Sequence, residues 1–469
     1  MNAKDPSVLV FDIGKTHVKV TLLDMTGVQL YQNRTSNKVR DTYPYASHDI
    51  NHIWTWFIAE LSKLAGQYHI TSISIASHGA TAALVGSKTG ELLLPIMDYE
   101  FKSYPVDLPD YASLRPPFDM TGSPEFPAGL NLGRQLHWQC QILSADLIKS
   151  AALLLYPQYW AWRLTGILSS EVTSLGCHTD LWNVKTNSPS PLLETLGLQN
   201  ALPPMSKAWE PLGKVALEIA AETGLNSDCL VYPGVHDSNA GYLPMLRRPK
   251  DLRPTVISSG TWTIIMDSQA KVDGLDSAKD MLVNIDAEGS ALITARYMGG
   301  REFGLICERF NTDIATTFTD EDIQTIIESN TLILPSFCQG TGPYPDKVGR
   351  VVFENGPIEI NGKAAATLYS ALMVTDILKR LSPDSVSDIL VEGSFASNSV
   401  LCGLIAALNP KRKLRIQNRG NGVTEGCFLI TQWNSDFELA GNREVIPYSP
   451  ENLSRYARNW SEALLRPRT

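Results

Sequence analysis

The stretch Val8-Leu-Val-Phe-Asp-Ile-Gly-Lys-Thr-His-Val-Lys-Val-Thr-Leu-Leu-Asp24 decides how the start of this chain folds. Two apolar runs rich in β-branched residues flank a short segment with an acid, a glycine and a hydroxyl, which predicts a β-hairpin. The turn presents Asp12, the backbone amides around Gly14, and Thr16. Glycine lets a backbone approach a phosphate closely, clustered N–H groups bind anions, and a neighbouring carboxylate is a typical Mg²⁺ ligand.

The same pattern recurs later in the chain, at Thr255-Val-Ile-Ser-Ser-Gly-Thr-Trp-Thr-Ile-Ile265. An apolar strand again leads into a turn, here with Gly260 and Thr261, and a second apolar strand follows. Neither stretch is a Walker loop or a Gly-x-Gly-x-x-Gly dinucleotide motif. Two hairpins of one design suggest two related halves, with a nucleotide phosphate held by the two turns.

Two further stretches place polar groups at the ends of predicted strands. The strand that begins at Leu230 stops at proline and glycine, and Asp237 follows where a helix is expected to start. An aspartate at this position is either a helix cap or a functional acid. The strand from Ile389 ends in Gly393, and a helix begins near Asn398. Such a glycine-containing strand-to-helix turn offers a flat surface for a base or a phosphate.

Composition limits the possible functions. The chain has 469 residues, 43% of them hydrophobic and 19% charged, and a net charge of −9. This length favours two domains, and the acidic balance argues against nucleic-acid and membrane partners. Because no signal core precedes the first strand and no apolar run reaches transmembrane length, we expect a cytoplasmic protein. Seven scattered cysteines and eight histidines without metal-ligand spacing argue against a Cys/His metal site.

Apolar periodicity predicts the remaining elements. We expect a loop over 36–52, helices over 51–65 (capped by Asn51), 131–149, 157–166 and 364–381, strands over 70–76 and 82–85, an apolar segment over 92–97 that delivers Asp98 at its end, and irregular structure over 102–130.

Taken together, these motifs resemble the FGGY carbohydrate kinases of the actin/hexokinase superfamily. Each motif is short, but their order along the chain is specific. They are Asp12 to Thr16, Ser77 to Gly79, Pro95 to Asp98, Thr121 to Pro127, Tyr159 to Gly166, Ser170 to Ser174, Gly234 to Asp237, Ser258 to Trp262, and Gly393 to Asn398. The pair His236–Asp237 and the turn over 258–262 most resemble the rhamnulose and fuculose kinases.

The resemblance implies an α/β fold with two actin/hexokinase-like (ribonuclease H-like) domains flanking an ATP/sugar cleft. We place an N-terminal sugar-binding domain at residues 1–243, a C-terminal nucleotide-binding domain at 244–440, and a tail packing on the second domain at 441–469. The family also makes a homodimer the expected oligomeric state.

The implied activity is ATP-dependent phosphorylation of a hydroxyl of a ketose of the rhamnulose, fuculose, ribulose or xylulose class. Asp237 is then the general base, and Asp12 the Mg²⁺ ligand. The resemblance assigns ATP and its phosphates to Gly14, Lys15, Thr16, Gly260, Thr261, Gly393 and Asn398, and the sugar to His78, Asp98, His236 and Glu171. Lys15 and Glu392 depart from the residues that the family commonly has, and a solvated Lys15 is the alternative to a phosphate ligand. The stretch from Met298 to Arg301 has no assigned counterpart.

Other functions remain open at this point. An actin-like ATPase or a sugar sensor without kinase activity would share most of the motifs, although it would not need a carboxylate aimed at a hydroxyl. A nicotinamide-dependent oxidoreductase would need the missing dinucleotide motif. Nothing in the sequence requires a non-catalytic scaffold.

Overall fold

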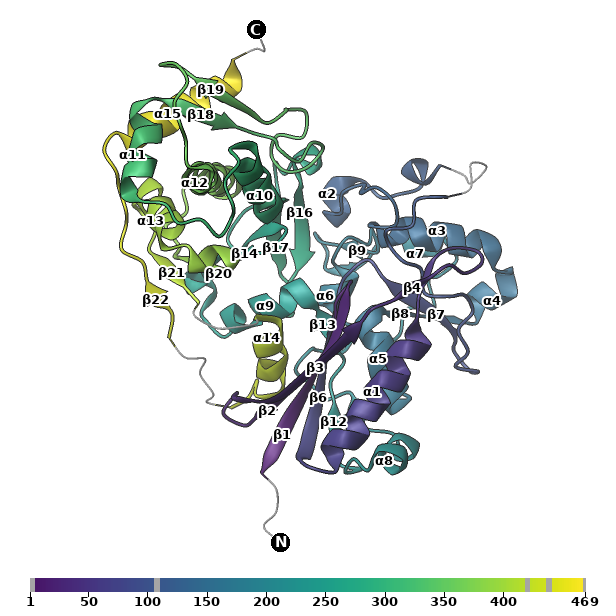
Figure 1. The fold of residues 1–469 in the computed structure, drawn as a ribbon. Helices are drawn as coiled ribbons and strands as arrows, with labels where there is room; N and C mark the ends of the chain where they lie inside the picture. Colours follow the sequence, from purple (N-terminus) through teal and green to yellow (C-terminus); the bar gives the residue numbers. More distant parts are fainter. Residues whose placement is uncertain (1–4, 105–109, 418–421, 436–440, 467–469) are drawn as a thin grey trace. The chain divides into compact units, whose positions relative to one another are not determined.

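A computed structural model describes residues 5–104, 110–417, 422–435 and 441–466 (Figure 1). The chain divides into two compact units, each described here by itself. The first unit comprises Met1–Arg247, Val283–Ala291 and Asn421–Leu439, and the second comprises Arg248–Leu282, Leu292–Gly420 and Ala440–Thr469. Among the described helices, none is both long enough and apolar enough to cross a membrane.

The first unit is built on a seven-stranded sheet with the order β11-β12-β6-β1-β2-β3, in which β13 also pairs with β6. Its central hairpin is β1 (Pro6–Ile13) with β2 (His17–Asp24), which confirms the hairpin predicted at the start of the chain. Strands β12 and β13 run parallel to β6, and β6 runs parallel to β1, so their carboxyl ends lie at one edge of the sheet. The other strands are β3 (Gln29–Ser36), β6 (His69–Ser77), β11 (Gly213–Lys214), β12 (Leu230–Val231) and β13 (Val235–His236).

One face of this sheet carries the main apolar core of the unit. Helices α1 (Ile50–Ala65) and α5 (Tyr156–Thr165) cover it. The Phe11 ring stacks on Phe57 of α1 at 3.7 Å and meets the edge of Trp160 of α5 at 5.7 Å. Because strand side chains alternate between faces, Asp12 next to Phe11 points away from this core.

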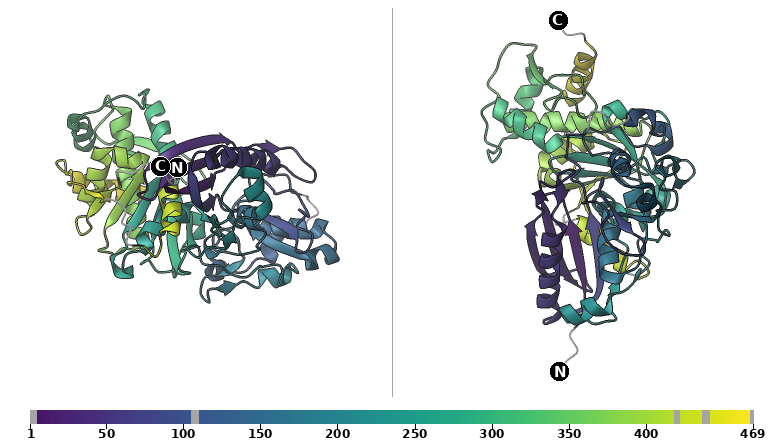
Figure 2. Two further views of the ribbon diagram at one scale, coloured as in Figure 1. Left: turned by 90° about the horizontal axis from the view of Figure 1, so that it is seen from below. Right: turned by 90° about the vertical axis from the view of Figure 1, so that its right-hand side faces the viewer.

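The opposite face is covered by α9 (Asp237–Leu246) and α14 (Gly422–Thr431), which come from distant parts of the sequence. Helix α14, yellow-green in Figures 1 and 2, contacts β1 and β6. It approaches α9 so closely that a Cβ on Gly426 would lie 1.8 Å from the Ala240 carbonyl oxygen. This packing groups α14 with the first unit, whereas the linear division predicted from the sequence assigns it to the second domain.

Three expectations for the first unit are wrong in detail. Helix α1 begins one residue before Asn51, because the Asp49 side chain accepts from the His52 amide. The helix expected over 131–149 is two helices, α3 (Leu132–Ile142) and α4 (Ala145–Lys149), because Ser144 caps a new start. The range 36–52 also contains a short strand pair, β4 (Val39–Arg40) and β5 (Ser47–His48). The apolar segment over 92–97 leads to Asp98 as expected, and isolated bridges tie its ends to Val85 and Ser47.

The remaining elements of the first unit lie outside its main sheet. They are β7 (Ala82–Gly86) paired with β8 (Ala151–Leu155), β9 (Trp182–Asn183) paired with β10 (Ser188–Pro189), the helices α2 (Phe118–Thr121), α6 (Val172–Leu175), α7 (Leu192–Thr195) and α8 (Leu217–Thr223), and the 3₁₀ turn η1 (Tyr111–Ser113).

A second seven-stranded sheet has the order β16-β17-β15-β14-β20-β21-β22. Strands β14 (Thr255–Ser259) and β15 (Thr263–Asp267) confirm the second predicted hairpin. Strand β20 (Ile389–Gly393) runs parallel to β14, and α12 (Gly362–Leu381) is buried along most of its length, as its composition predicts. The C-terminal helix α15 (Leu453–Leu465) packs on β18 (Thr331–Leu334), where Trp460 donates to the Ile333 carbonyl.

The other elements of this part of the chain complete the second sheet and its surroundings. They are β16 (Met281–Ile285), β17 (Ala291–Tyr297), β19 (Arg350–Phe353), β21 (Leu414–Ile416), β22 (Arg443–Glu444), α10 (Gly299–Arg309), α11 (Asp320–Glu328), α13 (Ser399–Leu408), and the 3₁₀ turns η2 (Lys250–Leu252), η3 (Ser277–Lys279) and η4 (Ser394–Ser397).

Candidate functional site

The carboxyl ends of three parallel strands bring most of the first unit's predicted site residues to one sheet edge. Ile13 of β1 pairs with Ser77 of β6, and Ser77 pairs with His236 of β13. The chain therefore leaves this edge at the phosphate turn, at His78 and at Asp237. Ligands of open α/β sheets bind at such carboxyl ends.

The first turn is closed by its own backbone. The Gly14 amide donates to the His17 carbonyl at 3.0 Å, and the Asn37 side chain donates to the Gly14 carbonyl at 2.8 Å. The amide of Gly14 is thus already used within the turn. Thr16, by contrast, is exposed, and its hydroxyl lies 3.1 Å from the His17 ring. The predicted phosphate contact of Gly14 would depend on close approach rather than on its amide.

Lys15 connects the phosphate turn to the predicted sugar residues. Its ammonium group pairs closely with Asp98, lies 3.4 Å from Glu100, and sits 4.9 Å from the centre of the Tyr99 ring. The Lys15 side chain is only 18% exposed. The alternative of a freely solvated lysine is therefore wrong, and the positive charge lies beside Asp98.

Asp12 is a buried carboxylate at the end of β1. Lys19 of β2, its partner in register, approaches one carboxylate oxygen to 2.8 Å. Burial raises the pKa of Asp12, Lys19 opposes this shift, and the charge of Asp237 adds to it. Among the described residues, no group of three or more acidic, histidine or cysteine side chains could hold a metal. Asp12 nevertheless fits Mg²⁺, which is held in proteins by one or two carboxylates together with water and phosphate oxygens.

Asp237 is the first residue of α9, and its side chain is 29% exposed. One carboxylate oxygen accepts from the Ser238 amide at 2.6 Å and lies 3.2 Å from Nε2 of His236. The N-cap position itself belongs to His236, whose side chain makes no capping bond. A negative charge at this helix end is favourable. The capping alternative thus explains one contact of Asp237 but not its pairing with the imidazole.

The backbone of His236 is fixed by a buried chain of hydrogen bonds. Its amide donates to the Thr173 hydroxyl at 3.0 Å, and that hydroxyl donates to Glu171 at 2.5 Å. Glu171 also accepts from the Thr173 amide at 3.0 Å, which caps α6. Burial raises the pKa of Glu171 to about 7. The hydrogen bonds of Glu171 lie within its own segment, so it holds the backbone of His236 through Thr173, and its charge also acts on the His236 imidazole.

The imidazole of His236 is buried and contacted at both nitrogens. Nδ1 lies 3.2 Å from Oδ1 of Asn239, and Nε2 lies 3.7 Å from Sγ of Cys177 as well as close to Asp237. Burial alone would lower the pKa of His236, but Cys177, Asp237 and Asn239 outweigh it and raise the pKa to about 10. The sequence pattern did not point to Cys177 or Asn239.

His78 belongs to a buried cluster of rings. The centres of the His48 and Tyr156 rings each lie 5.2 Å from its own, and that of Tyr99 lies at 5.3 Å. Burial lowers the pKa of both His78 and His48 to about 3, so both rings are neutral at pH 7. Nε2 of His78 and both ring nitrogens of His48 are buried without a hydrogen-bond partner among the described residues. His48 lies in β5, inside a range expected to be a loop, so nothing in the sequence singled it out.

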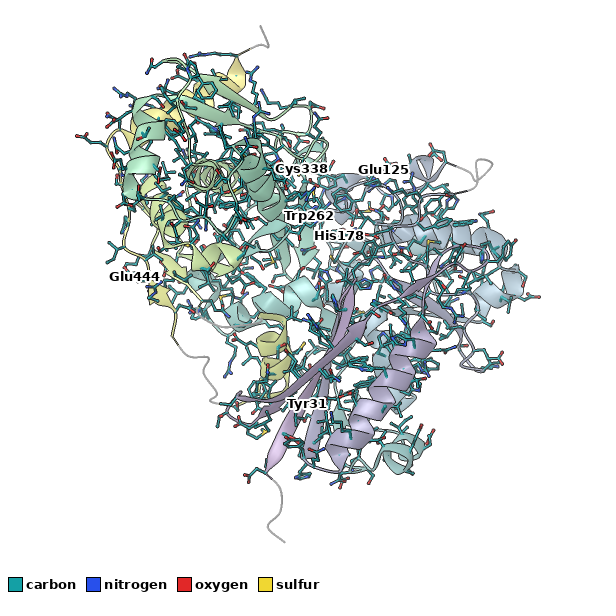
Figure 3. All side chains as sticks on the ribbon, in the orientation of Figure 1. Tyr31, Glu125, His178, Trp262, Cys338 and Glu444 are labelled. Atoms are coloured by element: carbon teal, nitrogen blue, oxygen red, sulfur yellow. The ribbon has the colours of Figure 1, made fainter. Side chains whose placement is uncertain are left out.

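In the second unit, three glycines bring backbones into close contact around the β14–β15 turn. Gly393 has a φ of +76°, and a Cβ there would lie 2.0 Å from the Ser259 carbonyl. A Cβ on Gly300 would lie 2.1 Å from the Gly260 carbonyl. Thr261 is exposed at the turn, and Trp262, labelled in Figure 3, follows it. The unassigned stretch from Met298 to Arg301 is thus the start of α10, packed on this turn.

Asn398 is the N-cap of α13, and its two side-chain ends have different partners. Its oxygen accepts from the Leu401 amide at 3.0 Å, and its nitrogen donates to Thr367 of α12 at 3.0 Å.

Glu392, at the end of β20, is buried, and burial raises its pKa.

One solved structure matches this chain over almost its whole length. It is a carbohydrate kinase from Novosphingobium aromaticivorans, 33% identical, with 98% of both chains covered and a TM-score of 0.88. The model of the carbohydrate kinase FGGY C-terminal domain matches residues 251–438. The chain belongs to the FGGY carbohydrate kinase family. The resemblance inferred from the motifs is therefore confirmed, and so is the expected fold class of two α/β domains.

Two further matches have lower sequence identity to this chain. An L-fuculokinase from Haemophilus influenzae is 25% identical over 274 residues, which cover 55% of this chain and 57% of the relative. This alignment spans little more than half of the curated relative's length. A gluconate kinase structure from Lactobacillus acidophilus is 17% identical, with a TM-score of 0.77 and 98% of this chain covered, and it shows the shared fold alone.

Proposed function

We propose that this FGGY family member is a cytoplasmic, ATP-dependent carbohydrate kinase that phosphorylates a hydroxyl of a ketose. The observation that carries the proposal is the sheet edge of the first unit, where Asp12, His78 and the His236–Asp237 pair follow neighbouring strands. The name of the L-fuculokinase relative supports a ketose of the rhamnulose, fuculose, ribulose or xylulose class. A homodimer remains the oligomeric state that we expect.

Asp237 is the general base in this proposal. An alcohol does not ionise at neutral pH, so its attack on the γ-phosphorus requires a positioned proton acceptor. The partly exposed carboxylate of Asp237 accepts the hydroxyl proton as the new phosphorus–oxygen bond forms and the bond to ADP breaks. General-base catalysis of this kind contributes about 10²–10⁴-fold to the rate.

Asp12 would hold Mg²⁺ with the nucleotide phosphates. When bound, this ion neutralises phosphate charge, which is the main requirement of phosphoryl transfer. The exposed hydroxyls of Thr16 and Thr261 are available to phosphate oxygens. At Gly260 the nearest contact of a Cβ would be the Trp262 carbonyl at 3.9 Å, so this backbone is open to a phosphate, whereas Gly393 holds its own turn against Ser259.

Four residues of the first unit are assigned to the sugar side. His78 offers a ring nitrogen that has no hydrogen-bond partner among the described residues, whereas both ring nitrogens of His236 already face protein groups, so His236 would contribute through its pairing with Asp237. Asp98 offers a carboxylate already paired with Lys15. Polar sites of this kind discriminate between sugars because a buried polar group left unpaired is costly. Glu171 supports the sugar side indirectly, because it holds the backbone of His236 through Thr173.

An ADP-release assay across a sugar panel tests this function. The panel contains L-rhamnulose, L-fuculose, L- and D-ribulose, L- and D-xylulose and glycerol, each with ATP and Mg²⁺. We expect turnover that requires one ketose and is lost in Asp237→Ala. ADP release that is independent of every sugar and of the substitution would contradict the kinase and favour a nucleotide-hydrolysing relative.

A further inference from the structure

The hydrogen bonds of Asn239 determine which atom it turns toward His236. Its side-chain nitrogen donates to the backbone carbonyl of Ile285. A carbonyl oxygen can only accept, so the NH₂ end of the amide is committed to Ile285. The atom 3.2 Å from Nδ1 of His236 is therefore the amide oxygen, which is itself an acceptor. A hydrogen bond at this position requires a proton on Nδ1.

The surroundings of Nε2 then define the charge of the ring. Nε2 faces Oδ1 of Asp237 at 3.2 Å and Sγ of Cys177 at 3.7 Å. A bare Nε2 would direct its lone pair at the carboxylate, whereas a protonated Nε2 donates to it. With Nδ1 already protonated, the second proton makes the ring an imidazolium. An opposite charge at this distance favours the ionised form of a carboxylate, which is the form a general base needs.

We propose that Asn239 is a positioning residue of the active site, which holds a proton on Nδ1 of His236 and so presents a charged Nε2–H to Asp237. The Asn239 side chain contacts His236 and the Ile285 carbonyl, so it acts through His236. The titratable groups that face this imidazole are Asp237 of α9, Cys177 after α6, and Glu171 before α6. The raised pKa of His236 agrees with this arrangement.

The protonation state can be measured without any sugar. In protein labelled with ¹⁵N-histidine, long-range ¹H–¹⁵N spectra distinguish protonated from bare ring nitrogens, and His236→Gln identifies the signals of His236 by their loss. At pH 7.5 we expect protons on both nitrogens of His236, and loss of the charged state at this pH in Asn239→Leu. A bare Nδ1 or a bare Nε2 in the wild-type protein, or an unchanged ring in Asn239→Leu, would overturn the proposal.

A pair of variants separates positioning from a purely structural tie to Ile285. Asn239→Asp keeps an acceptor for Nδ1 but loses the donor to Ile285, whereas Asn239→Leu loses both. We expect the His236 spectrum of Asn239→Asp to stay close to that of the wild type. Equal changes in the two variants would show that only the bond to Ile285 matters and would overturn the proposal.

The kinetic consequence rests on the proposed function. We expect Asn239→Leu to lower kcat by about 10²-fold, as misplacement of a catalytic group does, and to move the acid limb of the kcat profile to higher pH. Asn239→Asp should recover most of both. A wild-type protein that shows the expected spectrum but no sugar-dependent turnover would contradict the kinase function and leave the protonation inference standing.

Discussion

Replacement of Asp180 by alanine should strongly destabilise the first unit. This carboxylate is fully buried and accepts five hydrogen bonds, and the side chains that donate them come from separate segments of the chain. Arg115 donates twice, at 3.0 and 3.1 Å, Tyr111 and Asn131 each donate at 2.8 Å, and Thr121 donates at 2.9 Å. The segment expected to be irregular over 102–130 is therefore organised around one buried charge.

The size of the effect follows from what the substitution leaves behind. Asp180→Ala removes the main ionic partner of the Arg115 guanidinium, whose side chain is only 12% exposed, and leaves only the half-exposed Glu125 at 3.8 Å as a carboxylate. The Thr121 hydroxyl loses its acceptor, and Tyr111 and Asn131 each lose one of two. Breaking a buried ion pair from one side costs about 3–5 kcal/mol. For a unit of this size, about 2–4 °C of melting temperature corresponds to 1 kcal/mol, so the expected loss is about 6–20 °C.

Asp119→Ala is the matched control, because Asp119 is also paired with a cation but lies in solvent. Asp119 is 71% exposed and its partner Lys185 is 50% exposed, so we expect little change in melting temperature. Differential scanning calorimetry gives the melting temperatures, and hydrogen exchange shows whether protection is lost in α3, which Asn131 caps. If the melting temperatures of Asp180→Ala and Asp119→Ala both lie within about 2 °C of the wild type, the hydrogen bonds to Asp180 do not contribute this stability and the reasoning is wrong.

Three further predictions concern the proposed roles of single residues. The folded protein favours the protonated form of Glu171, because its pKa is raised from the usual 4.5 to about 7. The stability that this side chain contributes is therefore present below pH 4.5 and is lost as the pH rises to about 7. Glu171→Gln should therefore gain melting temperature relative to the wild type between pH 4.5 and 7, and a gap that does not change with pH would contradict the shift. Gly393→Ala should weaken ATP binding, measured by calorimetry, because its Cβ would meet the Ser259 carbonyl at 2.0 Å; Gly274→Ala, also at positive φ but with open space around it, is the control and should bind ATP normally. Asp12→Asn should raise the Mg²⁺ concentration for half-maximal activity by about 10–100-fold, as loss of a metal-site group does, and an unchanged requirement would remove Asp12 from the metal site.

Local patterns predicted the two hairpins and the strand ends correctly. In both hairpins, apolar runs flank a short turn with glycine and threonine, and that information lies within about twenty neighbouring residues. The placement of His78 and Asp237 at one edge follows from parallel strands, so it was also predictable. The break between α3 and α4 was harder to predict, because the apolar pattern continues across it. The only local sign of a new helix start is Ser144, whose side chain caps α4.

The remaining features depend on contacts between residues far apart in the sequence. Gly426 belongs with the first unit because its missing side chain lets α14 meet α9, which no local pattern reveals. Asn239 donates to Ile285, and Cys177 lies beside His236, and in both cases the two residues are far apart in the sequence. Local patterns therefore could not reveal either contact. The local sequence around His48, which was expected to be a loop, does not single this residue out, and its ring becomes notable only through its burial beside His78.

The central claim is that Asp237 acts as the base for transfer to a sugar hydroxyl, and one paired measurement tests it most directly. For the wild type and Asp237→Asn, kcat with the preferred ketose is compared with the Kd of that ketose from calorimetry. The account predicts that kcat falls by about 10²–10⁴-fold while sugar binding is retained, because a general base contributes to the rate and not to the shape of the site. A variant that keeps wild-type kcat would contradict the account.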